Sequence, residues 1–106
     1  MKTRYMIALI AALSISSIAL AANDGEVLFN KNKCATCHKM DKKTVGPALR
    51  DISAKYVGNG EALAILEKKV REGGVGVWGK MPMPRTPAAV SDDEIKAMVE
   101  WMLSHN

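Results

Sequence analysis

The segment Cys34-Ala35-Thr36-Cys37-His38 constrains this chain more than any other part of its sequence. It contains both cysteines of the 106-residue chain and one of its two histidines. The C-x-x-C-H spacing is the one used for covalent attachment of c-type haem. Two thiols three positions apart on one helical turn can reach the two vinyl groups of the haem, and the next side chain then lies under the iron. The motif therefore predicts one haem c per chain, with thioether bonds at Cys34 and Cys37 and with His38 as an iron ligand.

Three other interpretations of the motif explain less. A thioredoxin-like C-x-x-C would need a surrounding βαβ pattern, which the sequence lacks. A zinc site needs four ligands, and only Cys34, Cys37, His38 and His105 are on offer, without the spacing of a zinc finger. A Cys34–Cys37 disulfide would close a very small loop and would leave His38 without a role.

Residues 1–21 have the features of a secretory signal peptide. A basic start is followed by an apolar run at residues 6–13 and by the small-x-small cleavage pattern Ala19-Leu20-Ala21. Cleavage there, or after Ala22, leaves one domain of residues 22–106 in the periplasm. A retained membrane anchor is the alternative, but three serines interrupt a stretch that is short for a spanning helix. We therefore expect no stable membrane insertion after cleavage.

The size and charge of the remaining domain limit the classes of protein to which it can belong. Lys2 and Arg4 leave with the signal, so 13 of the 15 basic residues remain against 11 acidic ones. These charges are interleaved and aromatic residues are few, which argues against a nucleic-acid partner. A domain of about 85 residues is small for a self-sufficient core, so a cofactor that adds apolar surface would stabilise it. We expect a monomer.

Apolar residues at helical spacing predict an all-α fold of four to five short helices wrapped around the haem. The predicted helices are Asp24–Lys33 with Asp24 as N-cap, Ala48–Tyr56, Glu61–Glu72 ending at Gly73-Gly74, and a last helix that begins at Ser91. Residues 75–89 hold three prolines and two glycines, so we expect a long irregular loop there. The clearest signal is Ser91-Asp92-Asp93-Glu94, a capping box followed by an apolar stripe: Ile95, Met98, Val99 and Met102.

A second iron ligand, opposite His38, would decide what the haem can do, because a closed site transfers electrons and an open one permits gas binding or catalysis. Met40 lies two residues beyond His38, on the same side of the haem, and is interpreted as a packing residue. Met98 and Met102 belong to the apolar stripe of the last helix, where methionine is more often core than ligand.

Met81 and Met83, in the segment WGKMPMP, remain as candidates. Residues two apart in an extended segment point in similar directions, so periodicity does not choose between them. Prolines on both sides of Met83 fix its backbone and favour it. His105 is a further alternative, although its place near the chain end favours an exposed surface residue.

Three quoted segments together resemble the small class I bacterial cytochromes c of the cytochrome c-551 type. They are EVLFNKNKCATCHKMDKKTVGPALRDISAKY, EGGVGVWGKMPMP and AVSDDEIKAMVEWMLS. The resemblance extends from Glu26 to Ser104, with the haem motif, the G-P turn, the V-W-G segment, M-P-M-P and the S-D-D-E helix in the family's order. It implies the cytochrome c fold, with Cys34 and Cys37 as thioether sites.

The resemblance also implies a role for individual residues of the pocket. His38 is the proximal ligand and Met83 the distal one, while Met81 takes a position usually held by another apolar residue. The Pro47 carbonyl accepts the other ring N–H of His38, and Trp78 and Lys69 approach a haem propionate. The chain departs from its relatives at residues 84–89, where the loop is longer and lacks the asparagine that lies near the ligand sulfur in those proteins.

The function implied is one-electron transfer in the periplasm, not catalysis. The resemblance suggests a nitrite reductase, a terminal oxidase or cytochrome c peroxidase as acceptor, and a membrane cytochrome complex or a small copper protein as donor. Basic residues flank both ligand-bearing loops: Lys33, Lys39, Lys42, Lys43, Lys80 and Arg85. They are either ordinary solvated charges or a docking ring for an acidic partner.

Overall fold

The computed structural model describes residues 16–105. Its elements are α1 (Ser16–Lys31), a 3₁₀ turn η1 (Cys34–Thr36), α2 (Leu49–Lys55), α3 (Ala62–Glu72) and α4 (Asp92–Leu103). Within the described range the only β pairing is two isolated bridges, so the predicted all-α class is confirmed. No helix in this range is both long enough and apolar enough to cross a membrane.

Helix α1 begins earlier than the sequence pattern predicted. Its first turns are formed by residues 16–23, so Asp24 lies inside the helix and the prediction that it is the N-cap is wrong. The reason is local. Residues Ala19-Leu20-Ala21-Ala22, which precede Asp24, are strong helix formers, so the helix begins before it. Residues 1–15 of the predicted signal peptide lie outside the described residues.

The other helices begin and end where their local signals predicted. The Ser91 hydroxyl accepts a hydrogen bond from the Glu94 amide (3.1 Å), and the Glu94 carboxylate accepts one from the Ser91 amide (2.9 Å). These two bonds complete the capping box of α4. The four residues of its predicted apolar stripe are all buried. At the end of α3, Gly73 adopts φ 68°, a conformation that favours glycine.

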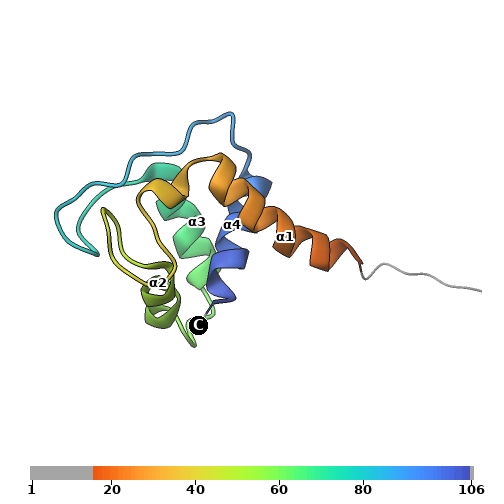
Figure 1. Ribbon diagram of the computed structural model, residues 1–106, viewed down its shortest axis with the longest axis horizontal. Helices are drawn as coiled ribbons and strands as arrows, with labels where there is room; N and C mark the ends of the chain where they lie inside the picture. The colour runs from red at the N-terminus through yellow and green to blue at the C-terminus, as the bar shows by residue number, and fades with distance from the viewer. Residues whose placement is uncertain (1–15, 106) are drawn as a thin grey trace, which may run out of the picture.

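Helix α4 is the centre of the fold and packs against α1, α2 and α3 (Figure 1). At the crossing with α1, a Cβ atom on Gly25 would collide with the Ala97 carbonyl and the Trp101 side chain, so the two backbones approach closely. Phe29 of α1 packs on Trp101 with 5.2 Å between ring centroids. At the C-terminal end of α4, the Ser53 hydroxyl of α2 donates to the Leu103 carbonyl (3.1 Å).

The loops at residues 37–48 and 73–83 lie side by side at one end of the molecule (Figure 1). The free end of α1 projects from the opposite end. The helices thus form a frame that holds these two loops together, and the predicted site residues lie on them.

Candidate functional site

A cavity of about 470 Å³ lies between the two loops and the helices behind them. Its volume falls within the range of about 300–1,000 Å³ that is typical of cofactor sites. The inner wall is formed by residues of the hydrophobic core: Phe29, Leu49, Ile52, Leu66, Met98, Val99 and Met102. The core of this small domain is therefore open on one side, as expected of a protein that a bound apolar group completes.

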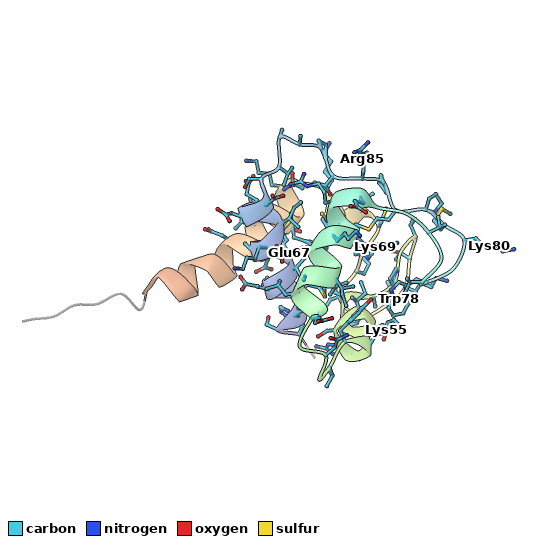
Figure 2. The ribbon with its side chains drawn as sticks, turned by 180° about the vertical axis from the view of Figure 1, so that it is seen from behind. Lys55, Glu67, Lys69, Trp78, Lys80 and Arg85 are labelled. Carbon is cyan, nitrogen blue, oxygen red and sulfur yellow. The ribbon has the colours of Figure 1, made fainter. Side chains whose placement is uncertain are left out.

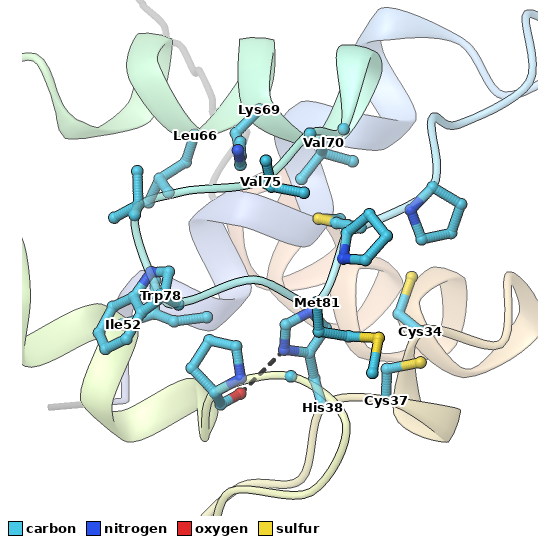
Figure 3. Close-up of a pocket in the computed structure, with 18 of the residues that line it drawn as sticks. Cys34, Cys37, His38, Ile52, Leu66, Lys69, Val70, Val75, Trp78 and Met81 are labelled. Atoms are coloured by element: carbon cyan, nitrogen blue, oxygen red, sulfur yellow. Dashed lines mark hydrogen bonds between the residues drawn. The ribbon is translucent and has the colours of Figure 1, made fainter.

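One side of the cavity is formed by the C-x-x-C-H motif (Figure 3). The 3₁₀ turn carries Cys34, and Cys37 and His38 follow directly, so all three side chains reach the same cavity. Both cysteines are free thiols and half-buried, and burial raises the pKa of the Cys34 thiol. No cluster of three or more His, Cys, Asp or Glu side chains that could hold a metal ion occurs among the described residues.

The ring of His38 is fixed by the G-P turn. Its Nδ1 lies 2.9 Å from the Pro47 carbonyl oxygen (Figure 3). A carbonyl only accepts, so Nδ1 carries the hydrogen and Nε2 keeps its lone pair for a metal. A Cβ on Gly46 would lie 2.7 Å from His38 Cε1, so only glycine lets the ring lie this close to the turn.

Met83 and Met81 both line the cavity, but their backbones are held differently. The Met83 amide and carbonyl each pair with Gly74 at 2.9 Å, in an antiparallel bridge that ties the segment to the end of α3. Met83 is half-buried. Met81 is 65 % exposed, and neither its amide nor its carbonyl takes part in a comparable bridge.

Of the other sulfur and imidazole candidates, Met40 and His105 lie outside the cavity lining, whereas Met98 and Met102 belong to it. Met40 packs against the hydrophobic core and does not line the cavity. His105 is also absent from the cavity lining: its ring meets Trp101 edge to face, and its Nδ1 lies 2.8 Å from the Trp101 carbonyl. These contacts leave it half-buried, so the expectation of an exposed surface residue is wrong. Met98 and Met102 are buried in the core, as predicted, and also form part of the cavity wall.

A cationic group lies at the opposite side of the cavity from the motif. Trp78 and Lys69 both line the cavity, and a Cβ on Gly74 would come within 3.3 Å of Lys69 Nζ. Sequence reasoning missed Lys55, whose Nζ lies 5.7 Å from the Trp78 ring centroid (Figure 2). No local signal could have found this contact, because it joins α2 to a loop 23 residues later.

The fold and the site define a small helical protein that holds its cofactor covalently in an apolar cavity. The donor set fits haem c: two thiols and a tautomer-fixed imidazole on one side, methionine sulfur on the lining, and apolar walls between them.

Comparison with known proteins agrees with this class. The model of the family described as "Cytochrome c" matches residues 22–106. The chain is 42 % identical to cytochrome c-551 of Pseudomonas aeruginosa over 104 residues, which cover 98 % of both chains. It is also 42 % identical to cytochrome c-552 of Nitrosomonas europaea over 105 residues, again 98 % of both chains. The chain belongs to the cytochrome c family.

The fold comparison leads to the same family. The crystal structure of wild-type Nitrosomonas europaea cytochrome c552 superposes with a TM-score of 0.72 at 43 % identity, covering 76 % of this chain and 99 % of that one. The protein is therefore a small class I electron carrier with one covalently attached haem.

Proposed function

We propose that the protein is a periplasmic one-electron carrier in which His38 and Met83 ligate the haem iron and Cys34 and Cys37 form the thioether bonds. The observation that carries the proposal is the double hydrogen bond between Met83 and Gly74, because it holds one methionine of the lining in place. Pro82 and Pro84 on either side restrict the backbone further. Met81, by contrast, is largely exposed.

The chemistry follows from a closed coordination shell. The haem supplies an iron that changes oxidation state by one electron, and methionine ligation favours the reduced form. The protein holds the His38 ring through Pro47, keeps Met83 in place through Gly74, and would offer a bound haem a mostly apolar wall. A substrate finds no open coordination position, so the site favours electron transfer over catalysis.

Two matched variants test the ligand assignment. Met83→Ala should abolish the near-infrared methionine-to-iron charge-transfer band of the oxidised protein, whereas Met81→Ala should leave it unchanged. Both variants remove the same side chain from the same proline-flanked segment, so their difference isolates ligation. The reverse result would assign the ligand to Met81, and loss of the band in neither would reject both.

We also propose that the exposed edge of the pocket docks an acidic redox partner. Exposed apolar side chains lie on the lining of the cavity: Val45, Val75, Val77 and Met81. The basic residues that flank the haem motif and Met83 in the sequence are all exposed, and Lys43 and Lys80 also line the cavity: Lys33, Lys39, Lys42, Lys43, Lys80 and Arg85. Figure 2 shows Lys80 at the tip of the 73–83 loop, pointing away from the fold. An apolar centre with a cationic rim fits a transient partner of opposite charge, whose approach it accelerates.

Small redox reagents of opposite charge test the docking surface without a known partner. Oxidation by anionic hexacyanoferrate(III) should slow as salt is added, and Lys80→Glu should slow it severalfold at low salt. Cationic tris(phenanthroline)cobalt(III) should show the opposite salt trend. Lys96→Glu, on α4 and outside the cavity lining, is the charge-matched control. Equal effects of the two variants would remove the special role of the rim.

A further inference from the structure

The side chain of Arg71, in the last turn of α3, is bonded to the segment that follows Met83. It donates to four oxygen atoms: through Nη1 to the carbonyls of Thr86 (3.3 Å) and Pro87 (3.0 Å), and through Nη2 to the Val90 carbonyl (2.7 Å) and Asp92 Oδ1 (2.8 Å). About a quarter of the side chain remains exposed. One planar cation thus holds three backbone carbonyls of a segment that has little regular structure of its own.

Two further bonds tie the same segment to the end of α3. The Thr86 amide donates to the Arg71 carbonyl (3.2 Å), and the Thr86 hydroxyl donates to the Val70 carbonyl (2.7 Å). Both acceptors are carbonyls of the last helical turn, which have no partner within the helix. We call the six contacts of Arg71 and Thr86 the Arg71 clamp.

The segment from Met83 to Thr86 is anchored at both of its ends to the end of α3. The bridge to Gly74 holds Met83 itself, and the Arg71 clamp holds Thr86, three residues later. Pro84 lies between them and has a restricted backbone. A movement of Met83 away from the cavity would therefore displace Thr86 and strain the hydrogen bonds of the Arg71 clamp.

We propose that Arg71 is a positioning residue for Met83, which keeps the methionine sulfur in place against exogenous ligands. This inference rests on the proposed function, in which Met83 ligates the iron. Arg71 does not line the cavity, so it acts only through the backbone of residues 86–90.

Imidazole binding to the oxidised haem protein measures the strength of this positioning. Imidazole is a neutral ligand that competes with methionine, and its binding removes the near-infrared band. In Arg71→Met, which keeps an unbranched side-chain stem but no donor, half-saturation should occur at an about tenfold lower imidazole concentration, the equivalent of one net hydrogen bond. Arg71→Lys should give an intermediate value, because an ammonium cannot bond in a fork.

Arg50→Met is the matched control. Arg50 makes one surface ion pair, 3.0 Å from Asp41, in which both side chains are more than half exposed. This variant removes the same charge and the same side chain, and its half-saturating concentration should equal that of the wild type. Thr86→Val removes one contact of the clamp without a charge change and should shift in the same direction as Arg71→Met.

The outcomes separate the inference from the proposed function. If the wild-type protein lacks the near-infrared band, both the proposed ligation by Met83 and the role of Arg71 are overturned. A wild-type protein with the band, and an Arg71→Met titration equal to that of Arg50→Met, overturns only the role of Arg71, even if the denaturant midpoint falls. If Arg71→Met does not yield folded haem protein, Arg71→Lys and Thr86→Val decide by the same criterion.

Discussion

Replacing Gly73 by alanine should weaken the protein at the point where α3 meets the Met83 segment. Gly73 has φ 68° and ψ −154°, a region that is essentially restricted to glycine. An added Cβ would collide with the Met83 carbonyl and would lie 2.8 Å from Pro84 C and 2.9 Å from Arg85 N. These are backbone atoms, and the Met83 backbone is fixed by its two bonds to Gly74, so it cannot move aside cheaply.

The expected loss of stability in Gly73→Ala has two additive causes. Backbone strain costs about 1–3 kcal/mol, and overpacking costs about 1–3 kcal/mol more. We therefore expect Gly73→Ala to lower the free energy of unfolding of the haem protein by about 2–6 kcal/mol, measured by denaturant titration.

Two other glycines separate these causes. Gly58 has φ 80° and no atom near its added Cβ, so Gly58→Ala should cost only about 1–2 kcal/mol of strain. Gly60 has neither positive φ nor a nearby atom, and Gly60→Ala should stay within about 1 kcal/mol of the wild type. If Gly73→Ala is no less stable than Gly58→Ala, the close contact between α3 and the Met83 segment is refuted.

Two further substitutions test local contacts that stabilise the fold and the site. The hydrogen bond from the Ser91 amide lowers the pKa of Glu94, so the carboxylate stabilises the fold above the ordinary glutamate pKa of about 4.3 and ceases to do so as the pH falls through the lowered value. Glu94→Gln should lower the unfolding free energy at pH 7, and its difference from the wild type should shrink as the pH falls through the lowered pKa of Glu94. A difference that stays constant with pH would contradict the account. Gly46→Ala should push the His38 ring off the turn and cost about 1–3 kcal/mol. Its measurement is denaturant unfolding together with the NMR signal of the His38 Nδ1–H, which should exchange faster than in Gly60→Ala.

The features that the sequence predicted are those whose causes are local. The capping box of α4 lies within four residues, its apolar stripe within one helix, and the glycine end of α3 within a single turn. The cavity wall formed by Cys34, Cys37 and His38 follows from one motif. The start of α1 was missed although its cause is also local. Helix formers before Asp24 extend the helix past the residue that was expected to cap it.

The remaining features depend on contacts between distant residues. Met81 and Met83 share the same local pattern, and only the bridge from Met83 to Gly74 distinguishes their backbones. Arg71 lies in the last turn of α3, and its bonds reach residues 15 to 21 positions away. The sequence carries no period or motif that reports such a contact.

Carbon monoxide binding to the reduced wild-type haem protein tests the central claim most directly. If Met83 closes the coordination shell opposite His38, the visible spectrum of the reduced protein should stay unchanged in carbon-monoxide-saturated buffer at neutral pH. Rapid appearance of a carbon monoxide adduct would show an open iron, and the protein would then be a ligand-binding or catalytic haem protein and not an electron carrier.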